Sequence, residues 1–179
     1  MQRFLLQHQK ALILTIGCGL IPLMLISTLL WIGISERNLS GLLIEPAFFP
    51  YVHIAFLFML AWLILMLEKI AAKVSDARKR HMQFLLLGVL ITAALFIGWH
   101  PENGMIQTVH IILSYAACVY MNVLFFRYCY LYEKERMIYM ALSATAFLIS
   151  VAAGEVSGIS EVLYASGCSV LLSLIAVKQ

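Results

Sequence analysis

Six long apolar stretches, separated by short polar connections, constrain this chain more than any other feature of its sequence. A helix needs about 20 predominantly apolar residues to cross the hydrocarbon core of a bilayer. The stretches that come close to this length lie at residues 11–34, 49–67, 82–99, 106–126, 137–153 and 160–177. Joining the last two would give one segment of about 40 residues, roughly twice what a bilayer accommodates. The sequence therefore predicts an all-α, polytopic transmembrane bundle of about six helices.

The composition supports lipid as the solvent for much of the surface. Of the 179 residues, 63% are hydrophobic and 12% are charged. Soluble domains are nearer to half apolar and a quarter charged, so one core cannot hold this excess. No linker or low-complexity stretch divides the chain, which indicates a single transmembrane domain over residues 1–179. The first stretch has a basic start like a signal peptide, but its long apolar run without a small-residue cleavage pattern predicts a retained helix.

The basic residues predict which way the bundle faces, because Lys and Arg concentrate in short cytoplasmic loops. With the amino terminus inside, all of the 12 Lys and Arg residues except Arg37 fall on the cytoplasmic side. Six crossings then place the carboxyl terminus in the cytoplasm as well. The run Arg78-Lys79-Arg80 fits a topology determinant and, alternatively, a contact with anionic lipid headgroups. Because topology already accounts for the net charge of +3, nucleic acid is not expected as a partner.

Polar side chains gather on the external face in this topology. On the fourth stretch, Gln107, His110 and Ser114 are spaced i, i+3 and i+7 and so share one helix face. Ser35 in the first external loop and Glu161 at the start of the sixth stretch lie on the same side. Polar groups at membrane depth need partners within protein or a hydrated cavity. We therefore predict an outward-facing polar cavity with Ser35, Gln107, His110, Ser114 and Glu161 as its binding residues.

Histidines at the same face raise the alternative of a metal site. His53, His100 and His110 would supply the three protein ligands that catalytic zinc takes, with water in the fourth position. The protein would then be a metal-dependent hydrolase or transferase acting on lipid, with Glu102 or Glu161 as acid or base. No two of these histidines have the i, i+4 spacing of a zinc-binding helix, so the set depends on helix packing. The simpler interpretation is that they cap helices or bond to loops, and that no cofactor is bound.

Short patterns in the external loops carry a resemblance to known proteins. These patterns are Ile34-Ser35 with Gly41 and Pro46, then Trp99-His100-Pro101 with His110, and Ile159-Ser160-Glu161-Val162. In this order they resemble the six-span Frag/DRAM/Sfk membrane proteins and a similarly arranged bacterial six-helix family of unestablished function. Val162 stands where those proteins carry an aromatic residue. The resemblance implies a six-span protein of the bacterial plasma membrane that is linked to lipid organisation or lipid-anchor remodelling.

Together these observations favour a small, non-catalytic integral membrane protein. Its outer cavity would handle or sense membrane lipid, or support a membrane protein partner or a second copy of the chain. The metal-dependent enzyme is the alternative. A transporter ranks third. Its usual sign is charged residues near mid-membrane, and the predicted topology places none there. The deepest polar residues here are only Thr92, Tyr115 and Asn122.

Overall fold

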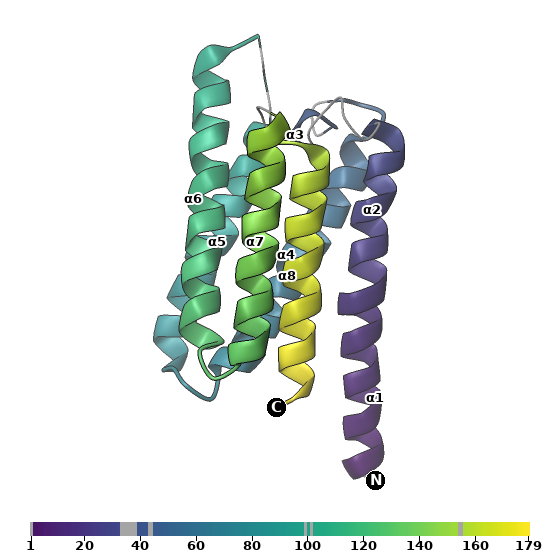
Figure 1. Ribbon diagram of the computed structural model, residues 1–179, viewed down its shortest axis with the longest axis vertical. Helices are drawn as coiled ribbons and strands as arrows, with labels where there is room; N and C mark the ends of the chain where they lie inside the picture. Colours follow the sequence, from purple (N-terminus) through teal and green to yellow (C-terminus); the bar gives the residue numbers. More distant parts are fainter. Residues whose placement is uncertain (1, 33–38, 43–44, 99, 101, 154–155) are drawn as a thin grey trace.

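The computed structural model describes residues 2–32, 39–42, 45–98, 100, 102–153 and 156–179. All regular secondary structure in these ranges is helical. The first span is one continuous rod (Figure 1) of α1 (Gln2–Leu14), the π-helical segment η1 (Thr15–Leu20) and α2 (Ile21–Ile32). The elements that follow are α3 (Leu39–Leu42), α4 (Phe49–Ala71), α5 (Ala77–Ile97), α6 (Gly104–Tyr128), α7 (Glu133–Ala153) and α8 (Gly158–Val177).

Within the described residues, six helices are long and apolar enough to span a membrane, which confirms the predicted number. Several helices extend beyond the predicted stretches at their polar ends. Helix α5 begins at Ala77 rather than at residue 82, because Asp76 caps it by accepting from the backbone N–H groups of Arg78 and Lys79, at 3.1 and 3.4 Å. A capped polar turn continues a helix past the region that hydropathy detects.

Both chain termini lie at the same end of the bundle, as an even number of crossings requires (Figure 1). We call this the terminal end, and the opposite one the distal end. At the terminal end, Lys178 forms an ion pair with Glu135 of α7. Gln179 donates from Nε2 to the carbonyl oxygen of Ile70 in α4 at 3.4 Å. The last residues of the chain therefore tie α7 and α4 to α8.

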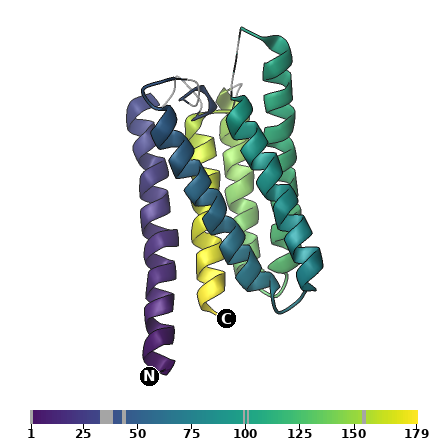
Figure 2. The same ribbon diagram turned by 180° about the vertical axis from the view of Figure 1, so that it is seen from behind.

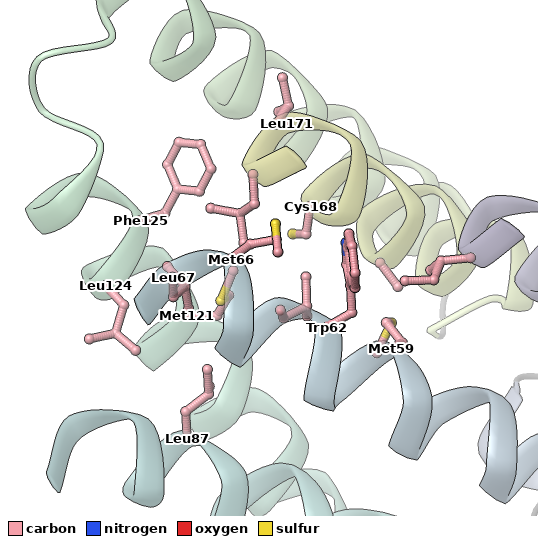
Figure 3. Packing of buried hydrophobic residues seen from close by; sticks show 14 of the residues in the cluster. Met59, Trp62, Met66, Leu67, Leu87, Met121, Leu124, Phe125, Cys168 and Leu171 are labelled. Carbon is pink, nitrogen blue, oxygen red and sulfur yellow. The ribbon is translucent and has the colours of Figure 1, made fainter. Parts of the chain in front are cut away.

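Helices α4 and α8 form the centre of the bundle. In the most apolar 18-residue stretch of each helix, the share of buried residues is 50% in α4 and 56% in α8, against 11% in α7. Figures 1 and 2 show α8 between the first span and α7, with α4 crossing behind it. Figure 3 shows the core between them, where side chains from four helices meet: Met59, Trp62, Met66, Leu67, Leu87, Met121, Leu124, Phe125, Cys168 and Leu171.

The π-helical segment of the first span is followed by a proline, Pro22. In that segment the N–H of Ile21 bonds the carbonyl of Ile16, five residues back. The next amide in this register belongs to Pro22, which has no hydrogen to give to the carbonyl of Gly17. The hydroxyl of Ser169 on α8 donates to that carbonyl instead, at 2.9 Å. A side chain of another helix thus satisfies the backbone group that the proline leaves without a donor.

The same position lets the first span approach α8 closely. A Cβ added to Gly17 would lie 1.8 Å from Ser173 Oγ and 2.8 Å from Trp62 Nε1. The indole N–H of Trp62 in turn donates to Ser173 Oγ at 3.1 Å. Small residues that permit such contacts are typical of helix interfaces in membranes. This crossing fixes the first span, α4 and α8 against one another.

Candidate functional site

A cavity of about 160 Å³ lies between α4, α5, α6 and α8. Its polar lining consists of His110 and Ser114 from α6 and of Glu161 and Tyr164 from α8. The other lining residues are apolar or carry sulfur: Phe56, Met59, Leu63, Ile91, Ala94, Leu95, Ala117, Cys118, Met121, Ala165 and Cys168. His110 and Glu161 lie in the first two turns of helices that begin at the distal end. The cavity is therefore polar toward that end and apolar deeper in the bundle.

His110 is held in one orientation by a neighbouring helix. Its side chain is 4% exposed, and Nδ1 lies 3.0 Å from the carbonyl oxygen of Ala94 in α5. Because a carbonyl only accepts, this contact assigns the proton to Nδ1, and Nε2 of the neutral ring is then an acceptor. The bond also joins α5 to α6 beside the cavity. His110 thus combines a structural bond on one nitrogen with an acceptor on the other.

Glu161 connects the cavity to the first connection at the distal end. Its Oε2 accepts a hydrogen bond of 2.6 Å from the backbone N–H of Leu39, the first residue of α3. Leu39 is fully buried, so the carboxylate replaces water for an amide that the bundle covers. The start of α8 itself is capped by Ser157, which accepts from the backbone N–H of Ser160 at 3.3 Å. Glu161 is therefore available to fasten α3 rather than needed as a cap.

Tyr164 belongs to this site although the sequence analysis did not single it out. Its hydroxyl lies 2.7 Å from that of Tyr139 on α7, which is itself fully buried. Tyr139 stacks on Phe125 of α6 with ring centroids 3.8 Å apart. Glu161, Tyr164 and Cys168 follow the i, i+3, i+7 spacing that marked the polar face of the fourth stretch. The same test applied to the sixth stretch would have found it.

The structure brings together three of the five predicted binding residues, namely His110, Ser114 and Glu161. Gln107 is half-buried on α6 but does not line the cavity. Ser35 lies outside the described residues, so its predicted place at the site is open. Of the deeper polar residues on α6, Tyr115 is 56% exposed and points away from the bundle centre.

The histidines of the metal hypothesis have separate surroundings. His53 Nδ1 lies 2.9 Å from the carbonyl oxygen of Phe49, and its ring packs between Phe49 and Phe96 at centroid distances of 3.8 and 5.5 Å. His100 Nδ1 lies 3.1 Å from Glu102 Oε1 in the connection between α5 and α6. In the part of the chain that the structure describes, no three His, Cys, Asp or Glu residues are placed to hold a metal ion. A zinc site built from His53, His100 and His110 stays a prediction.

Glu102, one of the two acids of that hypothesis, lies in the connection between α5 and α6, where hydrogen bonds favour its ionised form. A hydrogen bond to its own backbone, and then the one from His100, hold the pKa of Glu102 below its ordinary value. Its side chain is 70% exposed, in a connection outside the membrane-spanning helices. A carboxylate in this setting is ionised and solvated at neutral pH, whereas an acid catalyst needs a raised pKa. The geometry gives Glu102 no role at the cavity.

The size of the cavity limits what it holds. An apolar cavity of about 150 Å³ takes a benzene-sized molecule, and sites for larger ligands measure about 300–1,000 Å³. The cavity thus fits a small group, or one part of a longer molecule. The polar and apolar portions of its lining suit an amphipathic group with one hydrogen-bonding end.

Comparison with protein-family models, with curated proteins and with solved structures gives no match for this chain.

Proposed function

We propose that this chain is a non-catalytic integral membrane protein that binds a group of a lipid molecule in the cavity near its distal end. The observation that carries the proposal is the division of the cavity lining. Four polar side chains from two helices, His110, Ser114, Glu161 and Tyr164, line an otherwise apolar space, and His110 and Glu161 lie toward its distal end. That division matches a lipid segment with one polar group, such as a glycerol ester or the inner part of a headgroup.

The proposed orientation places the terminal end in the cytoplasm. Support comes from the basic residues, all but Arg37 of which belong to the termini or to connections on that side in a six-span chain. The cavity then faces the non-cytoplasmic leaflet, where a lipid enters it from the side or from the surface. The resemblance to Frag/DRAM/Sfk proteins and to the bacterial six-helix family agrees with this role and suggests a bacterial plasma membrane as its location.

Native mass spectrometry of the purified full-length protein tests the proposal. Ser114→Leu fills the cavity and removes one polar group, and His110→Ala removes another. Thr145→Ala is the matched control, because Thr145 is exposed on α7 and its hydroxyl donates to the carbonyl of Ala141 in its own helix, at 2.8 Å. We expect a lipid retained by the wild type and by Thr145→Ala, and a loss of about one lipid per chain in both cavity variants.

Two results would count against the proposal. Equal lipid retention in all four proteins would show that the cavity binds none. Metal analysis of the same samples decides the alternative function. About one zinc ion per chain, lost in His110→Ala together with a lipid hydrolase activity, would replace the binding protein by the metal-dependent enzyme.

A further inference from the structure

A second hollow, separate from the cavity, runs along the outside of the bundle between α4 and α5. It has a volume of about 680 Å³ and is lined by Ile64 and Glu68 of α4 and by one face of α5 from His81 to Phe96. It shares no residue with the cavity near the distal end. Figure 2 shows α4 and α5 meeting at the terminal end and separating toward the distal end. We call this hollow the α4–α5 groove.

The groove has the length of a lipid chain rather than of a small ligand. From His81 to Phe96 the α5 backbone rises about 22 Å, at 1.5 Å per residue. One leaflet of hydrocarbon is about 15 Å thick, half of the bilayer core. The volume of the groove, about 680 Å³, also falls within the range of about 300–1,000 Å³ that is usual for ligand sites. An extended acyl chain that starts at the terminal end would therefore run along the groove over its whole leaflet.

The cross-section of the groove suits a narrow occupant. Gly88 lies at its floor, where an added Cβ would be 3.6 Å from Ile64 Cδ1. Leu85 and Val89 line it as well and are 61% and 55% exposed, so they stand beside the recessed glycine. A helix with its side chains is about 10–12 Å wide and would rest on these exposed side chains instead of entering between them. An acyl chain is thin enough to reach the floor.

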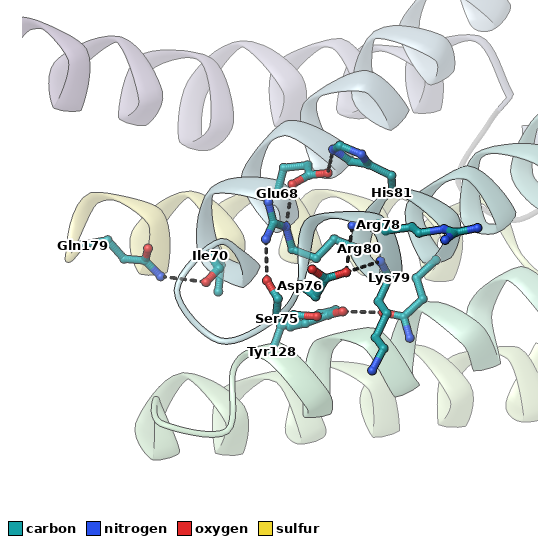
Figure 4. A network of polar contacts seen from close by, with 11 residues as sticks. Glu68, Ile70, Ser75, Asp76, Arg78, Lys79, Arg80, His81, Tyr128 and Gln179 are labelled. Atoms are coloured by element: carbon teal, nitrogen blue, oxygen red, sulfur yellow. Dashed lines mark hydrogen bonds and ion pairs between the residues drawn. The ribbon is translucent and has the colours of Figure 1, made fainter.

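Charged side chains mark the end of the groove at the terminal end (Figure 4). Glu68 lies on its lining and pairs with Arg80, Nε to Oε2 at 3.0 Å, and with His81, Nε2 to Oε1 at 3.1 Å. Arg80 also donates from Nη1 to the carbonyl of Ser75, so its guanidinium bonds both Glu68 and the connection before α5. The single acid on the groove is therefore already neutralised by residues of α5.

The charge that remains around this end is positive. Residues 68–80 contain five Lys or Arg side chains and two acidic ones, which is a net charge of +3. Arg78 and Lys79 are exposed in the first turn of α5, and Arg78, three residues before His81 and seven before Leu85, shares the helix face that lines the groove. Basic clusters at the edge of a bilayer attract anionic lipid headgroups. An occupant with a negative headgroup is therefore favoured over a zwitterionic one.

From this geometry we infer that the α4–α5 groove binds one acyl chain of an anionic phospholipid from the leaflet at the terminal end, with the phosphate next to Arg78. The guanidinium of Arg78, exposed on the helix face that lines the groove, supplies the donors for the phosphate oxygens. The groove holds the chain against Gly88 and Ile64. This site is independent of the cavity near the distal end and does not rest on the function proposed for it.

The test compares binding of two lipids with the same oleoyl chains, phosphatidylglycerol and phosphatidylcholine, to the delipidated protein by native mass spectrometry. We expect phosphatidylglycerol to bind the wild type at least tenfold more tightly, with a stoichiometry of one at this site. Gly88→Phe fills the groove and should weaken this binding about tenfold or more. The matched control is Leu86→Phe, because Leu86 is on the same helix, 46% exposed, and not part of the groove.

A charge variant separates the headgroup from the chain. Arg78→Gln should reduce the preference for phosphatidylglycerol to about twofold while phosphatidylcholine binding stays unchanged. Thr92→Phe, at another lining position, replaces Gly88→Phe if that variant does not fold. Equal binding by Gly88→Phe and Leu86→Phe overturns the inference, and so does equal affinity of the wild type for both lipids. A wild-type dimer that Gly88→Phe alone converts to monomer would overturn it too, because a second copy would then fill the groove.

Discussion

Helices α7 and α8 form one hairpin and are similar in length and mean hydropathy, yet α8 lies at the centre of the bundle and α7 at its edge. They have 21 and 20 residues, and the mean hydropathy of their most apolar windows is 1.6 and 1.7. Only 11% of the α7 window is buried, against 56% of the α8 window. Hydropathy cannot sort helices between the centre and the edge of a membrane bundle, because lipid tails are as apolar as a leucine core.

The difference lies in the size of the side chains where the helices meet. Ser169 and Ser173 of α8 are fully buried where the first span and Trp62 approach. On α7, the Thr145 hydroxyl donates to the carbonyl of Ala141 in its own helix, and Phe147 is 66% exposed. Small residues let backbones come close, and a hydroxyl then reaches a group on the neighbouring helix. Close approach rather than hydrophobicity thus selects α8 as the central helix.

The largest expected effect comes from the crossing of the first span with α8. In Gly17→Ala the new methyl group would lie 1.8 Å from Ser173 Oγ and 2.6 Å from Ser173 Cβ, so the two helices must separate. We expect the free energy of unfolding to fall by about 3 kcal/mol or more, at the upper end for overpacked cores. Gly19→Ala is the control, because nothing lies within 4 Å of its added Cβ. Thermal unfolding in detergent measures both, and similar stabilities would mean that the crossing is not tightly packed.

A smaller effect is expected where α8 meets α7. An added Cβ at Gly167 would lie 2.1 Å from Leu142 Cδ2, which is the far end of a flexible side chain. Leu142 can rotate toward lipid, so Gly167→Ala should cost about 1–2 kcal/mol, less than Gly17→Ala. The same unfolding experiment ranks the two variants. The reverse order would show that α7 is held more rigidly than the first span.

The interhelical hydroxyl bond should contribute less again. Ser169→Ala removes the donor to the carbonyl of Gly17 and should lower stability by about 0.6–1.7 kcal/mol, the range for such bonds in membrane bundles. Thr145→Ala removes a hydroxyl that bonds within α7 and should change stability by less than about 0.5 kcal/mol. Steric trapping in bilayers gives both values directly. An equal loss in the two variants would contradict the distinction drawn between α7 and α8.

The smallest effect is expected on the outer side of α7. Phe147→Ala should leave the unfolding free energy unchanged within about 0.5 kcal/mol. Phe147 is 66% exposed in the folded protein, so its side chain contacts lipid in both the folded and the unfolded membrane-inserted state. Sedimentation of the same variant checks its association state. A loss of several kcal/mol together with dissociation would mean that a second copy covers α7.

The membrane spans could be read from the sequence, while the site could be read only in part. His110 and Ser114 were found because a helix places residues three and four apart on one face, and Glu161 because it starts the sixth stretch on the same side of the membrane. The structure gathers these three at one cavity. The bond from Leu39 to Glu161 was not foreseeable, since it joins residues 122 positions apart. Neither was the wall that α4 contributes through Met59 and Leu63, because periodicity within one helix does not say which neighbour faces it.

The sequence by itself determined the number of crossings, their approximate bounds and the polar character of each connection. Those properties follow from the thickness of the hydrocarbon core and from the need of every backbone group in it for an internal hydrogen bond. The tertiary structure decided which helix is central and that a groove lies between α4 and α5. It also decided that Ser169 donates a hydrogen bond to the Gly17 carbonyl, for which Pro22 has no N–H. These depend on close contacts between helices, where differences of one methyl group decide the packing, and such contacts leave no periodic trace along the chain.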